Sequence, residues 1–391
     1  MHQPEPARRT RVLHLTQPVD GGVARVVTDL ARAQLAAGLH VTVACPAGPL
    51  DGPLRALGAQ VRHWAASRSP GPSLPGEVRR LARLLDEVRP DLVHAHSAKA
   101  GLAGRLALRG RIPTVFQPHA WSFEAVDGTT AALALRWERF GARWADRLLC
   151  VSDAERATGE RARIAGRWSV VPNGIDTGRF HPAPVDTVRA ALLPGLDAAA
   201  PLVVCVGRLC RQKGQDVLLR AWDAVARRTP GARLVLVGDG PEAERLRRGA
   251  PESVLFTGSV ADAVPWYQAA DLVVLPSRWE GMALAPLEAL ACGRAVVVTD
   301  VDGARESLPD ALASRCLVPA DDPSALADAV TALLLDPLLR ESLGHQGRRH
   351  VLATHDVRHT AERVAVVYRE LLTTTQGAPV APTECRESIH S

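Results

Sequence analysis

Short apolar runs alternate along this chain with longer segments in which apolar residues recur every three or four positions. The first run, Arg11–Leu15, is followed by an amphipathic segment at Val23–Ala37 and by a second run at His40–Ala44. Short apolar runs are typical of strands buried in a parallel sheet, and the longer period is typical of helices packed on one face. The chain is therefore expected to open with a strand, a Gly21-Gly22 turn, a helix and a second strand.

The alternation continues through the first half of the chain, beyond a Pro/Ser/Gly-rich loop at residues 66–76 that we expect to be mobile. It predicts further helices and strands at Val78–Val88, Asp91–Ser97, Val115–Trp121, Leu133–Ala145, Arg147–Ser152 and Ser169–Val171. Two of these strands run out into histidines, and in a parallel sheet such strand ends point into one cleft. A histidine is more often a packed or capping residue, so we interpret His119 as a functional candidate and His94 and His96 as structural.

A linker at residues 176–200 separates this half from a second series of the same kind. Strands are predicted at Leu202–Val206, Arg233–Val237, Val254–Thr257, Leu272–Leu275, Ala295–Thr299 and Cys316–Val318, and helices at Ala243–Arg248, Trp266–Ala270, Ala283–Ala291, Ser324–Leu335, Pro337–Thr354 and Val357–Leu372. Strands that alternate with helices on each side of a linker predict an α/β protein with two facing, doubly wound parallel sheets.

The composition predicts a cellular location and shows that charge is distributed unevenly between the two halves of the chain. We expect a cytoplasmic protein, because no apolar run has transmembrane length, no signal peptide is recognisable, and the seven Cys have neither disulfide nor zinc spacing. Residues 1–182 carry 25 Lys+Arg against 16 Asp+Glu, a balance of +9, and the remainder carry 22 against 26, a balance of −4. The basic half suggests an acidic partner such as an anionic membrane, and a solvated basic face is the alternative.

Lysine is almost absent from this arginine-rich chain, and only Lys99 and Lys213 occur. Retention of an ammonium at these positions suggests a geometric need for a compact charge. Lys213 lies with Gly207 and Arg208 on a loop that follows a predicted strand, where two cations could clamp a diphosphate. A pair of surface ion pairs is the structural alternative.

Two carboxylates, Glu280 and Glu288, lie on a predicted strand–loop–helix–strand unit between Leu272 and Thr299. If the helix begins near Met282, both can face the mouth of the sheet, and the N–H groups of Gly281 and Met282 form an anion site at its N-terminus. A carboxylate can accept hydrogen bonds from vicinal hydroxyls, and the neighbouring N–H groups can bind an anion. This combination suits a sugar nucleotide. In isolation, a loop charge and a solvated helix residue would be the simpler interpretation.

The E-x7-E stretch from Glu280 to Glu288 closely resembles that of the family 4 retaining glycosyltransferases of GT-B fold. The preceding G-R-x4-K at Gly207–Lys213 and G-D-G-P-E at Gly238–Glu242 resemble the same family, and the three motifs occur in its order. The resemblance extends over most of residues 11–370 and is strongest at 202–303. It implies an acceptor-binding Rossmann-like domain at residues 1–180, a nucleotide-sugar-binding one at 181–355, a helix at 356–373 that crosses back to the first, and a disordered tail at 374–391.

Site residues also follow from the resemblance. It implies that Glu288 holds the ribose hydroxyls, that Glu280 contacts the transferred sugar, and that His119 orients the sugar or the incoming hydroxyl. The catalytic set is His119, Arg208, Lys213 and Glu280, and the donor-binding set is Gly21, Gly22, Gly207, Arg208, Lys213, Gly238, Val260, Glu280, Gly281, Met282, Ala283 and Glu288. No metal is expected, because the D-x-D at Asp300–Asp302 lies where the family has a Gly-rich turn and is interpreted as structural.

The implied activity is retaining, metal-independent transfer of a sugar from a nucleotide-diphosphate sugar to a hydroxyl acceptor. A UDP-sugar is the expected donor and a GDP-sugar the second choice, with no separate cofactor and no nucleic acid. The expected acceptor is a lipid-linked saccharide or a cell-surface polysaccharide precursor, met by an enzyme peripheral on the inner membrane face. The alternatives are a natural-product aglycone as acceptor, a silent sugar-nucleotide-binding protein of this fold, and a sugar-nucleotide epimerase.

Overall fold

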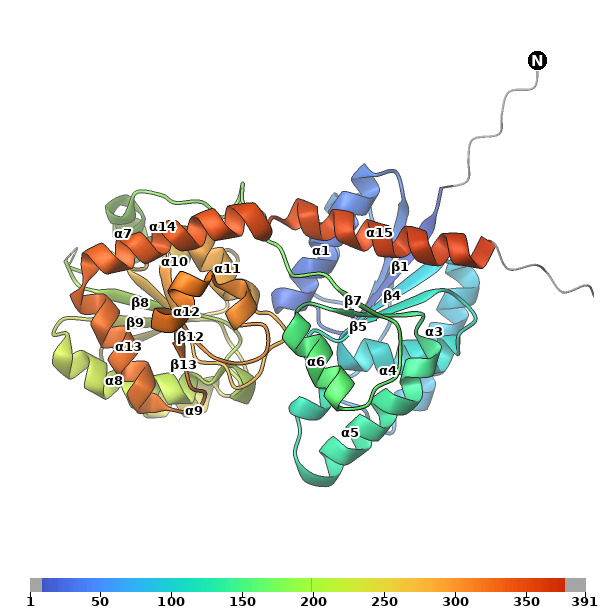
Figure 1. Ribbon diagram of the computed structural model, residues 1–391, viewed down its shortest axis with the longest axis horizontal. Helices are drawn as coiled ribbons and strands as arrows, with labels where there is room; N and C mark the ends of the chain where they lie inside the picture. The colour runs from blue at the N-terminus through green and yellow to red at the C-terminus, as the bar shows by residue number, and fades with distance from the viewer. Residues whose placement is uncertain (1–8, 198, 377–391) are drawn as a thin grey trace, which may run out of the picture.

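The chain folds around two parallel sheets that lie side by side in the computed structural model, which describes residues 9–197 and 199–376 (Figure 1). The seven strands of the first sheet have the order β3-β2-β1-β4-β5-β6-β7: β1 (Arg11–Thr16), β2 (His40–Cys45), β3 (Gln60–His63), β4 (Leu92–His96), β5 (Thr114–Gln117), β6 (Arg147–Cys150) and β7 (Trp168–Val170). The six strands of the second have the order β10-β9-β8-β11-β12-β13: β8 (Leu202–Val206), β9 (Arg233–Val237), β10 (Val254–Gly258), β11 (Leu272–Leu275), β12 (Ala295–Thr299) and β13 (Leu317–Val318). The expectation of two doubly wound sheets is confirmed.

Helices lie on both sides of each sheet (Figure 1). The first half contains α1 (Gly21–Ala36), α2 (Asp51–Ala56), α3 (Leu74–Val88), α4 (Ser97–Leu108), α5 (Gly128–Gly141) and α6 (Asp153–Arg161). The second contains α7 (Val185–Leu192), α8 (Gln215–Arg228), α9 (Ala243–Arg248), α10 (Val264–Ala269), α11 (Leu284–Ala291), α12 (Asp310–Cys316), α13 (Pro323–Leu335) and α14 (Pro337–Thr354). The last helix, α15 (Val357–Gln376), runs back along the first half and packs on α1.

Several predicted boundaries are wrong. The proposed linker contains α7, because Arg189 buries its guanidinium against the Ala269 carbonyl and Asp271 and so ties this segment to the second half. The helix α12 occupies a segment for which no helix was predicted, so the last strand begins at Leu317 and not at Cys316. Residues 374–376 continue α15 instead of starting a disordered tail, and the rest of that predicted tail, 377–391, lies outside the described residues.

The order of each sheet reverses at one point, between β1 and β4 in the first and between β8 and β11 in the second. Ligands of open α/β sheets bind beyond the carboxyl ends of the strands at such a reversal. One apolar cluster joins the two halves, since it includes strands of the second sheet, Val12 and Leu92 of the first, and Val364 and Val367 of α15. The two halves are therefore joined by a shared core.

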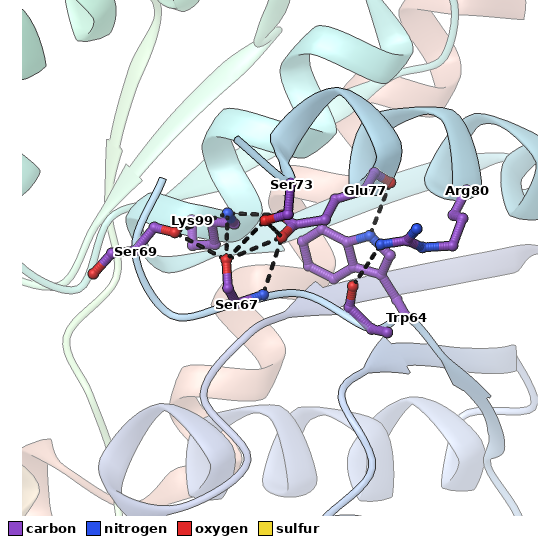
Figure 2. A network of polar contacts seen from close by, with 8 residues as sticks. Trp64, Ser67, Ser69, Ser73, Glu77, Arg80 and Lys99 are labelled. Atoms are coloured by element: carbon purple, nitrogen blue, oxygen red, sulfur yellow. Dashed lines mark hydrogen bonds and ion pairs between the residues drawn. The ribbon is translucent and has the colours of Figure 1, made fainter. Parts of the chain in front are cut away.

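The loop expected to be mobile is fastened to α3 by Glu77, as Figure 2 shows. Its Oε1 accepts hydrogen bonds from Ser67 N, Ser67 Oγ and Ser73 Oγ at 3.1, 3.0 and 2.7 Å, and Lys99 Nζ forms an ion pair with Oε2 at 2.7 Å. Both charged side chains are almost inaccessible, with 1% and 3% of their surface exposed. The helix begins at Leu74, with Pro75 in its first turn, so residues 74–76 are helical instead of loop.

Burial opposes ionisation of Glu77, but the hydrogen bonds from Lys99, Ser73 and Ser67 outweigh it and lower the pKa to about 2. The pKa in the unfolded chain is about 4.3, so the carboxylate stabilises the fold fully above that pH and loses its contribution as the pH falls through about 2. Lys99 is thus a structural cation, and one of the two retained lysines is explained by the fold alone.

We expect Glu77→Gln to lower the free energy of unfolding at pH 7 by about 3–5 kcal/mol, because it leaves the Lys99 ammonium buried without its counter-charge. Urea denaturation measures the change. The matched control is Asp328→Asn, which breaks the exposed Arg228–Asp328 pair and should cost less than about 1 kcal/mol. Equal losses in the two variants would show that the buried pair contributes no more than a surface one.

Candidate active site between the two sheets

Glu280 lies on the loop between β11 and α11, directly beyond the reversal point of the second sheet. Its Oε1 accepts hydrogen bonds from Ser277 Oγ at 2.7 Å and from Lys213 Nζ at 2.5 Å, and 8% of the residue is exposed. Within the described residues, Oε2 accepts no hydrogen bond. The carboxylate is therefore held from one side and has one oxygen available to a ligand.

Lys213 reaches Glu280 because two loops pack backbone against backbone. It ends a 3₁₀ turn at Arg211–Lys213, and the next residue, Gly214, has a φ of +64°. A Cβ on Gly214 would lie 2.0 Å from the Pro276 carbonyl oxygen, so only glycine lets the turn approach the Glu280 loop. The sequence predicts that Lys213 contacts a diphosphate, and the structure pairs its ammonium with Glu280.

Arg208 differs from Lys213 in having no partner for its charge. Among the described residues, none forms a hydrogen bond or an ion pair with its guanidinium, and only its carbonyl is bonded, to Gln215 Nε2 at 3.0 Å. The residue is half-buried at the end of β8, beside Gly207. A Cβ on Gly238 would lie 2.2 Å from the Gly207 oxygen, so the loops after β8 and β9 also touch through their backbones.

Glu288 lies inside α11 and is buried, so the interpretation of a solvated helix residue is wrong. Its Oε2 accepts a hydrogen bond from the Tyr267 hydroxyl at 2.7 Å, and its Oε1 lies 3.8 Å from Arg25 of α1. Burial raises the pKa of Glu288, and the Arg25 charge and the Tyr267 hydrogen bond oppose that rise. The second carboxylate of the E-x7-E stretch therefore faces a cation of the first half.

The Gly21-Gly22 turn, which follows β1, lies against α11, the helix that contains Glu288. Gly22 lies against α11, where a Cβ would be 3.7 Å from Leu284, and Gly21 faces open space with a φ of +69°. Val260, the residue expected near the base, is half-buried beyond β10. The structure thus brings the Gly21-Gly22 turn beside the E-x7-E helix, although the two are far apart in the sequence.

The helix α11 begins at Leu284 and not near Met282, because Ala283 has an extended ψ of 141°. The N–H groups of Gly281 and Met282 consequently belong to the loop. Their carbonyls accept hydrogen bonds from Ser152 Oγ at 2.9 Å and Asn173 Nδ2 at 2.8 Å, both from the first half. The two N–H groups donate to no described residue, so the loop keeps donors for an anion although it is not the helix terminus itself.

His119 touches this loop from the other side. A Cβ on Gly281 would lie 3.0 Å from the His119 carbonyl carbon and 2.9 Å from Glu155 Oε1. The φ angles of His119 and Ala120 are +59° and +127°, and the Ala120 N–H donates to Glu155 Oε1 at 2.7 Å. A backbone in this sparsely populated region costs roughly 1–3 kcal/mol and is held here by a buried carboxylate.

Behind His119 lies a cluster of buried polar side chains that the sequence did not reveal. His94 and His96 are buried, as expected. His96 is bonded to His14 of β1, and His94 to Tyr368 of α15, while His14 is bonded in turn to Gln34 of α1. Ring nitrogens of His14, His94 and His96 lie within 4.8 Å of one another, a grouping that no spacing of His along the chain announces. The available signal was weak: each of these histidines occurs in an otherwise apolar run that forms a central strand.

The D-x-D residues have structural partners. Asp300 Oδ2 pairs with Arg305 at 2.6 Å, and Asp302 Oδ2 accepts a hydrogen bond from Thr158 Oγ1 of α6 at 2.6 Å. Glu306 joins the same contact, because it accepts hydrogen bonds from the N–H groups of Asp153 and Ala154 at 2.8 Å each. Asp302 and Glu306 therefore dock the second half onto α6, whereas Asp300 pairs within its own half.

Known sequence families and relatives match most of the chain. Residues 20–179 match the family described as Glycosyltransferase Family 4, and residues 200–336 match Glycosyl transferases group 1. The chain is 31% identical to the alpha-maltose-1-phosphate synthase of Mycolicibacterium smegmatis, over 90% of this chain and 96% of that protein. It is 33% identical to the GDP-mannose-dependent alpha-(1-6)-phosphatidylinositol monomannoside mannosyltransferase of Mycobacterium tuberculosis, over 88% of this chain and 94% of that protein.

The fold is also that of a solved structure, Anabaena HepE in complex with UDP and glucose. The two agree with a TM-score of 0.80 over 93% of this chain and 100% of HepE, at 23% sequence identity. This likeness concerns the fold, while the family rests on the matched sequences. By those matches the chain belongs to glycosyltransferase family 4, the group 1 family of retaining GT-B enzymes that transfer a sugar from a nucleotide sugar.

Proposed function

We propose that this glycosyltransferase takes its sugar from a UDP- or GDP-sugar held by loops of the second sheet and passes it to a hydroxyl held by the first. In this proposal residues 181–355 bind the donor and residues 1–180 bind the acceptor. The observation that carries it is the arrangement around Glu280, where a paired Lys213, an unpaired Arg208 and the loop N–H groups lie beyond one strand reversal. Relatives support both bases, since HepE is solved with UDP and the mannosyltransferase is GDP-mannose-dependent.

A nucleotide-diphosphate sugar already has a good leaving group, so the protein must stabilise the charge that develops on the diphosphate. Glu280 uses one donor of the Lys213 ammonium, which leaves two for phosphate oxygens. Arg208 supplies a second cation, and the N–H groups of Gly281 and Met282 supply neutral donors. In this scheme no metal is needed, and turnover is expected to survive excess EDTA.

Glu280 keeps Oε2 for the transferred sugar, and Glu288 accepts from the ribose hydroxyls. Thermal-shift measurements with UDP, GDP and their sugars test donor binding directly, because a ligand that binds only the folded state raises the melting temperature. A shift with one nucleotide and not the other identifies the base. The absence of a shift with every nucleotide would contradict the donor site.

The acceptor we propose is a lipid-linked saccharide or a cell-surface polysaccharide precursor. One relative is a phosphatidylinositol monomannoside mannosyltransferase, and another is a lipopolysaccharide core biosynthesis mannosyltransferase of Rhizobium leguminosarum. Residues 1–182 have a balance of +9, which suits an anionic acceptor or surface. Transfer to a natural-product aglycone and not to lipid-linked saccharides would favour the alternative acceptor.

The helix α5 offers a surface for peripheral membrane contact. It exposes Leu133 and Phe140, 67% and 46% accessible, together with three arginines, Arg136, Arg139 and the neighbouring Arg143. Apolar side chains interleaved with arginine suit the interface of an anionic bilayer. Figure 1 places α5 at the outer edge of the first half, away from the second sheet. Among the described helices, none is long and apolar enough to span the bilayer.

The Lys213→Arg variant is expected to lower kcat at least about tenfold with little change in the donor KM. The planar guanidinium cannot replace a compact ammonium between Glu280 and a diphosphate, and the contact acts mainly on charge formed in the transition state. Steady-state kinetics measures both parameters. The matched control is Arg211→Lys, an exposed cation two residues away that pairs with Asp127. A Lys213→Arg variant with wild-type kcat would remove Lys213 from the leaving group.

For Glu288→Gln we expect the affinity for the nucleotide to fall about 10- to 100-fold, since a charge-assisted hydrogen bond of about 1.5–3 kcal/mol is lost. Calorimetric titration with UDP and GDP measures it. Glu244→Gln, on the exposed face of α9, is the control and should bind as the wild type does. Unchanged nucleotide affinity in Glu288→Gln would place the ribose elsewhere.

Co-sedimentation with anionic phospholipid vesicles at low salt is expected to retain the wild-type protein and to lose it as salt screens the arginines. A Leu133→Asp/Phe140→Asp double variant should stay in the supernatant. The control is Leu338→Asp, which changes an equally exposed leucine of the second half. Sedimentation that is equal for all three proteins would exclude α5 as the contact.

A further inference from the structure

The rings of His119, His96 and His14 form one hydrogen-bonded chain that leads from the cleft into the first half. His119 Nε2 lies 3.1 Å from His96 Nδ1, and His96 Nε2 lies 2.9 Å from His14 Nδ1. The ring centroids are 5.4 and 5.2 Å apart with interplanar angles of 24° and 26°. Rings that are nearly parallel, with nitrogens this close, meet edge to edge, which is the geometry of in-plane hydrogen bonds.

The far end of the chain determines which nitrogens carry protons. His14 Nε2 lies 2.8 Å from Gln34 Oε1, and an amide oxygen can only accept, so His14 is protonated on Nε2. The Gln34 amide is oriented by its own NH₂ group, which donates to the Tyr368 hydroxyl at 3.4 Å. That hydroxyl lies 2.7 Å from His94 Nδ1, so α15 takes part in fixing the amide.

Each neutral imidazole has one donor and one acceptor nitrogen, so the assignment propagates along the chain. His14 Nδ1 must accept from His96 Nε2, and His96 Nδ1 must then accept from His119 Nε2. Burial keeps the rings neutral, since it lowers the pKa of His14 to about 4 and that of His119 to about 3. His119 is therefore left with an unprotonated Nδ1.

That nitrogen is placed to meet a substrate. His119 is half-buried while His96 and His14 are buried, so it is the member of the chain that solvent reaches. Its Nδ1 has no hydrogen-bond partner in the part of the chain that the structure describes, and its backbone lies against Gly281 beside Glu280. An imidazole nitrogen without a proton can accept a hydrogen bond from a hydroxyl and cannot donate one.

We propose that His96, His14 and Gln34 are positioning residues that hold His119 in the tautomer with unprotonated Nδ1, so that it accepts a hydrogen bond from a substrate hydroxyl. The inference rests on the proposed function for the identity of that hydroxyl, which belongs either to the transferred sugar or to the acceptor. The tautomer itself depends only on the folded protein. It extends the site inward through three residues that touch no substrate.

The competing interpretation of this cluster is a metal site, because ring nitrogens of His14, His94 and His96 lie close enough together to bind one ion. Both ring nitrogens of His14 and of His96 are already hydrogen-bonded, so a metal bound to either residue would have to break one of these bonds. Coordination of His14 or His96 would also interrupt the chain to His119. A bound metal and the intact hydrogen-bonded chain therefore exclude each other, and an experiment can distinguish them.

The test is ¹⁵N–¹H NMR of the full chain labelled at histidine, with His119 assigned by its substitution. The expected result is a neutral His119 protonated on Nε2 in the wild type. In His96→Leu, which removes the acceptor, both tautomers should appear. In His96→Asn, whose amide oxygen can take the place of Nδ1, the wild-type signal should persist. A second variant, Gln34→Met, removes the anchor at the far end and should also mix the tautomers if His96→Leu does not fold.

Kinetics supply the functional readout. His96→Leu is expected to lower kcat about tenfold, and His96→Asn should restore most of it. Weaker binding of the nucleotide sugar, but not of the nucleotide alone, assigns the hydroxyl to the donor sugar, and a raised acceptor KM assigns it to the acceptor. Three results would overturn the proposal: a wild-type His119 protonated on Nδ1, a stoichiometric bound metal that His96→Leu releases, or mixed tautomers with unchanged kinetics. The NMR result does not require turnover, so it stands apart from any failure of the proposed function.

Discussion

The close approach of the Glu280–Met282 loop to the first half is the constraint on which the site depends. Gly281 has no room for a side chain, because a Cβ would lie within 3.0 Å of His119 and Glu155. Gly303 packs closely against its carbonyl oxygen, and Ser152 of the first half donates a hydrogen bond to that oxygen. The Gly281 and Met282 carbonyls accept hydrogen bonds from the first half, while the N–H groups of the same two residues remain available to a ligand. The same contact places the loop after β11 against the His119 backbone of the first half.

Charge pairing serves two purposes in this molecule, and the two lysines show the difference. Lys99 and Lys213 each face a carboxylate at 2.7 and 2.5 Å. The Lys99–Glu77 pair is closed off from solvent and surrounded by serine donors, so it fastens a loop. The Lys213–Glu280 pair is partly open, with 20% and 10% of the side chains exposed, and lies beside an unpaired Arg208. The two pairs therefore differ in exposure and surroundings, and the more open one is the pair at the proposed donor site.

The last helix joins the two halves chemically as well as by packing. Its apolar face completes the core shared with α1, and its Tyr368 hydroxyl enters the polar cluster behind His119. His355, just before α15, donates from Nδ1 to the Asn173 carbonyl, and the Asn173 side-chain amide donates to the Met282 carbonyl. A segment at the end of the chain therefore helps to set the position of groups on both sides of the cleft.

The sequence alone determined the fold class, the family and the main donor motifs, because these depend on local periodicity and on residues within one loop or helix. The apolar runs predicted most strands, and the order of G-R-x4-K, G-D-G-P-E and E-x7-E identified the family. The start of α11 was predicted one residue early, at Ala283, because that residue has an extended backbone that no sequence pattern shows. The linker helix α7 was missed because its stability comes from Arg189 contacts with residues 80 positions away.

Only the tertiary structure decided what surrounds each candidate. The Lys213–Glu280 pair, the Arg25–Glu288 approach and the Gly281–His119 contact all join segments that are distant along the chain. The imidazole chain joins β1, β4, the loop after β5, α1 and α15, and each histidine taken singly looks like an ordinary packed residue. A hydrogen bond depends on distances of about 3 Å and on direction, and no local pattern of residues encodes these across the fold.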